Sequence, residues 1–311
     1  MTRNSTYLLE APGEAARLVS KVDRHAWVAR YIRPLVADGP VLEVGAGRAH
    51  LLTAAVAGTG QVGVAVDLSH ARLRAGPRPD HDQWTTPHGR VDHRPDRTYP
   101  VCGDVQRIPL RTSMFGLAYA RFILEYLEDP MAAVLEMARV TRPGGHLLLQ
   151  DLDGQLLQHY PVDIELQTAL ETFLSGIRGR LDPNIGRKLF SLARNAGLQD
   201  LTVRLEPYHV IAGAADGATL TLWDTKLAHA LPVAIEVLGD ARARATKQRF
   251  LDYLADPTTL TYSLPVHRDR PRRPGLSFPG RQPRRSLGQS PAPLFPGRPR
   301  APSVTGRTWA M

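Results

Sequence analysis

The sequence predicts an α/β fold built around a mainly parallel β-sheet. Between residues 41 and 151, short apolar runs alternate with segments whose apolar residues recur at helical spacing. Strands that alternate with helices form β-α-β units, and the strands of such units run parallel. The chain has 311 residues, of which 43% are hydrophobic, so it can bury the core of one large domain or two small ones.

The strands of this sheet are expected where apolar runs end in glycine, aspartate or another polar residue. They lie at 41–44, 61–66, 99–102, 117–121 and 146–150. Helices are expected between them at 50–57 and 131–140, and the glycines that follow Pro143 end the second one. Outside this region we expect one or two helices at 14–35, one each at 162–177 and 185–196, and two at 220–254. Strands are expected at 201–205, open to extension as far as 211, and at 258–266.

The formal net charge of +9 belongs to the C-terminal segment. Residues 265–311 hold ten arginines and one aspartate, a net charge of +9, so residues 1–264 have none. Ten prolines lie in the same segment, and such a composition cannot bury a core, so we expect a disordered tail. A reading-frame shift in a GC-rich gene would also produce a sequence of this composition. Because the folded part has no basic field, we do not expect a nucleic-acid partner.

The rest of the chain divides into three expected parts. Residues 1–40 form a helical cap and 41–264 the main domain, with an insertion loop at 76–99 and a helical lid from 155–182 and 212–256. No run approaches the roughly 18 apolar residues of a membrane helix. The single cysteine, Cys102, allows neither an internal disulfide nor a cysteine-based zinc site. We therefore expect a cytoplasmic protein that uses no metal.

A composite motif predicts a nucleoside-type cofactor. The first strand runs into Glu43, Gly45 and Gly47 before a helix, and the second strand ends at Asp67. The glycines let the backbone turn tightly and approach a ligand closely. An aspartate about 20 residues further on accepts hydrogen bonds from two ribose hydroxyls.

Five motifs in order resemble the Rossmann-like S-adenosylmethionine-dependent methyltransferases of the small-molecule type. They are VLEVGAG at 41–47, VAVDLS at 64–69, CGDVQRIPL at 102–110, RFILEYLEDP at 121–130 and EMARVTRPGG at 136–145. The resemblance implies a three-layer fold whose mainly parallel sheet ends in an antiparallel strand. That last strand lies inside the sheet, between the fifth and sixth strands.

The resemblance also implies cofactor-binding residues for S-adenosylmethionine. Glu43, Gly45 and Gly47 would surround the methionine portion, and Arg121 would lie near its end. The ribose and adenine would be held by Asp67, Leu68, Asp104 and Val105. Two positions depart from the family. Ala49 replaces the usual third glycine and adds one methyl group where helix and strand pack, a tolerated variant in related folds. Gly116 replaces an aspartate after Phe115, and this loss questions stability more than binding.

The acceptor side is less determined by sequence. Tyr126, His159 and Tyr160 follow the fourth and fifth strands, so they would line the acceptor pocket or take its proton. Packing inside the lid is the alternative role for each. The predicted function is methyl transfer to a small molecule. The alternatives are a catalytically inactive protein of the same fold and a nucleic-acid methyltransferase that uses the basic tail.

Overall fold

The computed structural model describes residues 23–36, 38–76, 97–154 and 156–271, with only the backbone for 267–271. The start of the expected first helix, residues 77–96 of the expected insertion loop and residues 272–311 of the expected tail lie outside this part. No helix among the described residues has both the length and the apolar character needed to cross a lipid bilayer.

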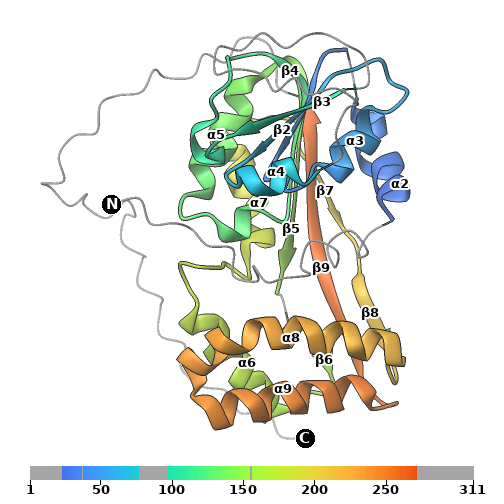
Figure 1. The fold of residues 1–311 in the computed structure, drawn as a ribbon, viewed down its shortest axis with the longest axis vertical. Helices are drawn as coiled ribbons and strands as arrows, with labels where there is room; N and C mark the ends of the chain where they lie inside the picture. Colours follow the sequence, from blue (N-terminus) through green and yellow to red (C-terminus); the bar gives the residue numbers. More distant parts are fainter. Residues whose placement is uncertain (1–22, 37, 77–96, 155, 272–311) are drawn as a thin grey trace, which may run out of the picture. The chain divides into compact units, whose positions relative to one another are not determined.

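A twisted sheet forms the centre of the protein (Figure 1). Its strands follow the order β3 (Thr98–Cys102), β2 (Gly63–Asp67), β1 (Val41–Val44), β4 (Phe115–Arg121), β5 (Thr141–Asp153) and β9 (Leu260–Pro271). On its other edge, β9 pairs with β7 (Thr202–Leu205). The first five are parallel, and β9 runs antiparallel to β5 and β7. The predicted fold class, with an antiparallel last strand inside the sheet, is confirmed.

Helices cover both faces of this sheet. On one face lie α2 (Arg24–Trp27), the turns η1 (Val28–Ile32) and η2 (Arg33–Leu35), and α3 (His50–Val56). On the other face lie α5 (Pro130–Val140) and α7 (Ile185–Asn195) (Figure 1). Shorter helices are α4 (His70–Arg74), η3 (Val105–Arg107) and η4 (Leu124–Tyr126). Residues 115–120 of β4 are all buried, as a strand with helices on both faces requires.

A second, smaller group of elements makes up the part that the sequence predicts as a lid, and we keep that name for it. It contains β6 (His159–Tyr160), α6 (Ile164–Gly176), β8 (Tyr208–Ala212), α8 (Gly217–Leu238) and α9 (Asp240–Ala255). The three helices lie together near the carboxyl end of β5 (Figure 1). Side-chain caps start α6 and α8, where Asp163 and Asp216 accept from backbone N–H groups. Gly239 has φ of +81°, and it separates α8 from α9, the two helices that the sequence predicts between 220 and 254.

Strand β9 joins the main sheet to the lid. Its first residues pair with β6 on one side and β8 on the other, and its later residues pair with β5 and β7. Pro207 lies between β7 and β8, where a residue without an N–H group interrupts the pairing along this edge. The predicted single stretch from 201 towards 211 is therefore two strands.

The prediction that β9 ends near Pro265 was wrong, because the strand continues to Pro271. The carbonyl oxygen of Pro265 accepts from the Glu206 N–H at 3.5 Å. The N–H and C=O groups of one residue point to the same side of an antiparallel strand, so the missing donor of Pro265 faces the connection between β7 and β8. No hydrogen bond to β5 is lost, and residues 265–271 belong to the sheet rather than to a tail.

Gly116 fills a position at which the main chain passes another segment closely. A Cβ atom at this position would lie 2.5 Å from the carbonyl oxygen of Asp38. The family aspartate would not fit against this backbone without a shift. The departure at Gly116, which raised doubt about stability, is therefore compatible with the local packing.

We predict that Gly116→Ala lowers the free energy of unfolding by about 1–3 kcal/mol, because the new methyl group overlaps a backbone oxygen. Urea denaturation monitored by circular dichroism measures this. Gly217→Ala is the matched control: nothing lies within 4 Å of its added Cβ atom, so its stability should be unchanged or slightly higher. Equal stability of the Gly116→Ala variant and the wild type would contradict the close approach.

Candidate functional site

The glycine loop after β1 is fastened to the end of β2. Gly45 and Gly47 have φ of +66° and +55°, a region in which glycine is favoured. The N–H of Gly47 donates to Oδ2 of Asp67 at 2.8 Å, and the N–H of Ser69 donates to Oδ1 at 2.8 Å. The sequence-predicted pair of loop and aspartate is thus brought together in the structure.

Ala49, in place of the third family glycine, also has a left-handed backbone, with φ of +57°. An L-residue in this region costs about 1–2 kcal/mol, so the methyl group is tolerated at a cost rather than freely. The sequence had suggested a packing effect between helix and strand. The structure places the cost in the backbone instead, at the residue before α3.

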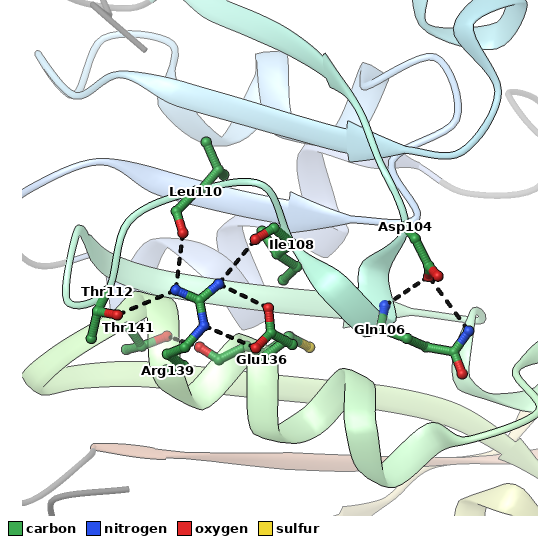
Figure 2. A network of polar contacts seen from close by, with 9 residues as sticks. Asp104, Gln106, Ile108, Leu110, Thr112, Glu136, Arg139 and Thr141 are labelled. Carbon is green, nitrogen blue, oxygen red and sulfur yellow. Dashed lines mark hydrogen bonds and ion pairs between the residues drawn. The ribbon is translucent and has the colours of Figure 1, made fainter. Parts of the chain in front are cut away.

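The predicted adenine-binding residues lie at the ends of β2 and β3. Leu68 follows Asp67 with 60% of its surface exposed, which offers an apolar face beside the carboxylate. The Gly103 N–H donates to the Asp67 carbonyl at 3.0 Å and ties the two strand ends together. Asp104 is exposed and accepts from the Gln106 N–H at 2.8 Å, so it starts η3 (Figure 2). Val105 is buried beneath it.

Arg139 of α5 holds the loop that follows η3. Its guanidinium makes two bonds to the Glu136 carboxylate, at 2.8 and 2.9 Å, and one each to the carbonyls of Ile108 and Leu110, both at 2.9 Å (Figure 2). A planar guanidinium suits this fork, because its five donors have fixed directions. The motif around Arg139 therefore positions the segment after Asp104, a role that sequence analysis did not assign.

A buried polar cluster lies beneath the glycine loop. Glu43 is 5% exposed, and its Oε2 accepts from the Leu52 N–H at 3.2 Å. Burial raises the pKa of Glu43 to about 8, against smaller opposite effects of Tyr119, Leu52 and Arg121. Burial and the neighbouring Glu43 raise the pKa of Tyr119 well above its usual value. The Tyr119 hydroxyl has no hydrogen bond of normal geometry within the described part of the chain.

Arg121 ends β4 among aromatic rings. Its guanidinium carbon lies 4.2 Å from the centre of the Phe122 ring and 5.4 Å from that of Trp27. Burial lowers the pKa of Arg121, and its buried Nε has no hydrogen-bond partner among the residues described. Arg121, which the sequence predicts as a cofactor residue, therefore lies near enough to Glu43 for their charges to interact. Its Nε still has a hydrogen bond to donate.

Asp151, near the end of β5, is a site residue to which sequence analysis gave no role. It is fully buried, and its Oδ2 accepts from the N–H groups of Leu124 and Glu125, at 3.0 and 3.2 Å. Burial, and next the neighbouring Glu125, raise its pKa well above the ordinary value. Asp151 thereby fixes η4 against β5. The sequence pattern that could have identified Asp151 is an aspartate directly after an apolar strand.

The three predicted catalytic residues lie on the lid side of these strands. Tyr126 is partly buried against an apolar cluster that includes Phe173 of α6. His159 is 8% exposed, and its ring meets the edge of Tyr253 at 5.4 Å. Tyr160 is 71% exposed. No hydrogen bond, ion pair or ring contact among the described residues joins His159 or Tyr160 to Glu43 or Asp67, so their catalytic roles stay predictions.

An open hollow of about 540 Å³ lies on the lid. Its lining is Pro161, Val162, Asp163, Ile164, Glu165, Arg249, Tyr253, Asp256 and Thr259. None of the predicted cofactor residues takes part. Arg249 pairs with Asp163 and Glu165 there, and with Asp256 the lining has three carboxylates for this one cation.

Comparison with known proteins identifies the central part of the chain. Residues 42–149 match the family model described as "Methyltransferase domain". The chain contains an S-adenosylmethionine-dependent methyltransferase domain. The resemblance predicted from the five motifs is confirmed, because the matched residues span them from the glycine loop to β5.

The curated relatives of this methyltransferase domain match over limited lengths. A malonyl-[acyl-carrier protein] O-methyltransferase of Alcanivorax borkumensis is 38% identical over 86 residues, 27% of this chain and 25% of the relative. A demethylmenaquinone methyltransferase of Mycolicibacterium vanbaalenii is 35% identical over 109 residues, 35% of this chain and 40% of the relative. The chain thus spans less than half of either relative.

Solved structures resemble the chain weakly. Phosphoethanolamine N-methyltransferase 2 of Haemonchus contortus, in complex with S-adenosyl-L-methionine, has a TM-score of 0.46 and 14% identity. This likeness covers 80% of the chain and 52% of that structure. At this level of similarity it says nothing about activity, and the roles of individual site residues in the methyltransferase domain stay predictions.

We predict that Arg139→Ala lowers the free energy of unfolding by about 1–3 kcal/mol, because Glu136 and two carbonyls lose charge-assisted partners. Urea denaturation gives the loss, and hydrogen exchange should speed up over 103–112. Arg244→Ala is the control, since Arg244 forms an exposed pair with Asp240 that solvent screens, so its loss should change the stability much less. Equal losses in the two variants would remove the special role of Arg139.

Proposed function

We propose that the protein transfers a methyl group from S-adenosylmethionine to a small-molecule acceptor. The observation that supports this most is the link from Gly47 to Asp67, which lies inside the methyltransferase domain at the carboxyl ends of β1 and β2. Ligands of open α/β sheets bind at this edge. The proposal extends the domain's identity to the activity of the whole chain.

The residues at this edge fit the cofactor chemically. A carboxylate has about four lone-pair positions, and two backbone donors use two of those on Asp67. Two positions are left, which matches two ribose hydroxyls. Open space lies where a Cβ atom of Gly47 would be, so a ligand can approach the loop backbone. The exposed Leu68 would pack against the planar base.

We assign the methionine portion to the glycine loop, with Glu43 and Arg121 beside it. These two groups have the charges that complement an ammonium and a carboxylate. Asp104 would accept from the adenine amino group, and the buried Val105 would support it from below. Arg139 would act indirectly, because it holds the backbone of the segment after Asp104.

The cofactor supplies an electrophilic methyl group on a positively charged sulfur. Held by the glycine loop and Asp67, it would offer this methyl group to a lone pair of the acceptor, and the proton that the acceptor loses would need a receiving group. Alignment provides most of the acceleration of such a step, and a base matters only when the acceptor must lose its proton first. Tyr126, His159 and Tyr160 are our candidates to receive it, and burial lowers the pKa of His159, which favours the neutral ring that can accept a proton.

A small-molecule acceptor is favoured by charge. Residues 1–264 have no net charge, whereas binding to phosphates needs a basic surface. The names of the two relatives give malonyl-[acyl-carrier protein] and demethylmenaquinone as acceptors for those proteins, and we extend only the small-molecule class to this chain. A cytoplasmic location is part of the same proposal, motivated by the single cysteine.

The main alternative is a protein of the same fold without activity. Its motivation is the glycine at position 116 and the Pro- and Arg-rich C-terminus. The close contact of Gly116 with Asp38 and the pairing of β9 with β5 and β7 speak against it.

We predict that the protein binds S-adenosylhomocysteine and that Asp67→Ala weakens binding by about 1–3 kcal/mol, because ribose hydroxyls lose their acceptor. Isothermal titration calorimetry measures the affinity. Asp67 also holds Gly47 and Ser69, so thermal unfolding must accompany the titration, and Asp240→Ala is an exposed-carboxylate control. Binding of NAD in place of S-adenosylhomocysteine would overturn the assignment.

We also predict that methylation acts on a small molecule and survives replacement of the arginines at 272–311 by glutamine. The physical reason is that catalysis needs alignment within the uncharged domain and no phosphate contacts. Transfer of radioactive methyl groups to a panel of small acceptors and to bulk RNA and DNA measures this. Activity on RNA or DNA that disappears in the glutamine variant would refute the prediction.

A further inference from the structure

Trp27 of α2 packs its indole ring at the ends of β4 and β5. The ring is buried, and its Nε1–H donates to Oε1 of Gln150 on β5 at 3.0 Å. Its centre lies 6.1 Å from that of the Tyr119 ring on β4. Two residues further along β4, the guanidinium carbon of Arg121 lies 5.4 Å from the centre of the Trp27 ring. A residue outside the five sequence motifs thus reaches the same strand ends as they do.

The guanidinium of Arg121 contacts two aromatic rings and no anion. Its carbon lies 4.2 Å from the centre of the Phe122 ring, and Trp27 is the second ring. An aromatic face attracts a cation, and the N–H donors of a guanidinium lie in its own plane. Among the described residues, no carboxylate pairs with Arg121 within 4 Å, and its buried Nε donates to none of them. The rings therefore orient a cation that has donors left for an anionic ligand.

Arg121 belongs to a segment that lies against the glycine loop. Strands β1 and β4 pair in register up to Val44 and Ala120, so Arg121 lies level with the first residue of the loop. A Cβ atom at that residue, Gly45, would lie 2.5 Å from Cγ1 of Ile123. A ligand on the glycine loop is therefore next to the end of β4.

The turn that follows Trp27 has a second anchor, which does not involve the indole ring. Arg30 of η1 forms an ion pair with Glu206 at 2.8 Å, and the Tyr31 hydroxyl donates to the same carboxylate. The turn itself is π-helical, a conformation that is frequent at functional sites. A change at Trp27 should therefore alter the surroundings of Arg121 before it releases this part of the chain.

We propose that Trp27 is a positioning residue of the cofactor site: its ring holds the Arg121 guanidinium in the direction in which it binds the carboxylate of the cofactor's amino-acid portion. This inference rests on the proposed function. The hydrogen bond to Gln150 fixes the ring, and the ring fixes the cation. The carboxylate is the single anion of the cofactor, so the ammonium and the sulfur need no assigned place in this inference.

Two ligands that differ only in the carboxylate test the proposal. S-adenosylhomocysteine and its decarboxylated form share the adenine, the ribose, the thioether sulfur and the ammonium. Isothermal titration calorimetry on the wild type should show tighter binding of the ligand with the carboxylate. Trp27→Leu removes the ring and should weaken that ligand about three- to thirtyfold, the range of a cation–π contact. The decarboxylated ligand should bind to Trp27→Leu as it does to the wild type.

A double-mutant cycle shows whether Trp27 acts through Arg121. Arg121→Met removes the guanidinium and should abolish the preference for the carboxylate, and Trp27→Leu should then weaken S-adenosylhomocysteine no further. Trp223→Leu is the matched control, because Trp223 is also buried and the Lys226 ammonium lies 4.3 Å from its ring centre. This control should leave the ratio of the two affinities unchanged.

Trp27→Phe covers failure of Trp27→Leu to fold. It keeps an aromatic face but loses the donor to Gln150, so its preference for the carboxylate should be weaker than that of the wild type. Equal weakening of both ligands by Trp27→Leu would show a merely structural role and overturn the inference. A further loss in the Arg121→Met background would do the same, as would equal affinity of the two ligands for the wild type. Where Trp27→Leu does not fold, an unchanged preference in Trp27→Phe overturns it. If neither ligand binds to the wild type, the proposed function fails instead.

Discussion

The structure depends on the insertion of β9 into the sheet. This strand pairs with β5 and β7 in the main sheet, and its first residues pair with β6 and β8 in the lid. One continuous strand thus fixes the lid to the sheet that bears the cofactor motifs. Backbone hydrogen bonds leave little freedom in register, because a slip by one residue would exchange the two faces of the strand.

The second organising feature is the number of ionisable groups buried near the carboxyl ends of the strands. Glu43 on β1, Arg121 on β4 and Asp151 on β5 have shifted pKa values because of burial. Such groups are costly in a free protein and are typical of ligand sites. Here they lie beside the glycine loop and η4, where cofactor and acceptor are proposed to meet.

The two departures from the family pattern show why motif matching alone misjudges single positions. Ala49 is a tolerated variant in related folds, yet its backbone is left-handed and carries a cost. Gly116 replaces an aspartate, yet it is the residue type that its neighbour Asp38 requires. Both outcomes depend on backbone geometry and close contacts, which no residue-by-residue comparison contains.

The sequence by itself determined the alternation of strands and helices, the glycine loop and Asp67, because apolar period and turn residues are local signals. It also predicted the domain family, since five ordered motifs leave few alternatives. Only the tertiary structure decided that β9 passes Pro265, that Arg139 holds the segment after Asp104, and that Asp151 fixes η4. The first depends on which side of the strand the N–H group that Pro265 lacks would face. The other two depend on hydrogen-bond partners tens of residues away in the sequence. A local sequence pattern contains neither kind of information.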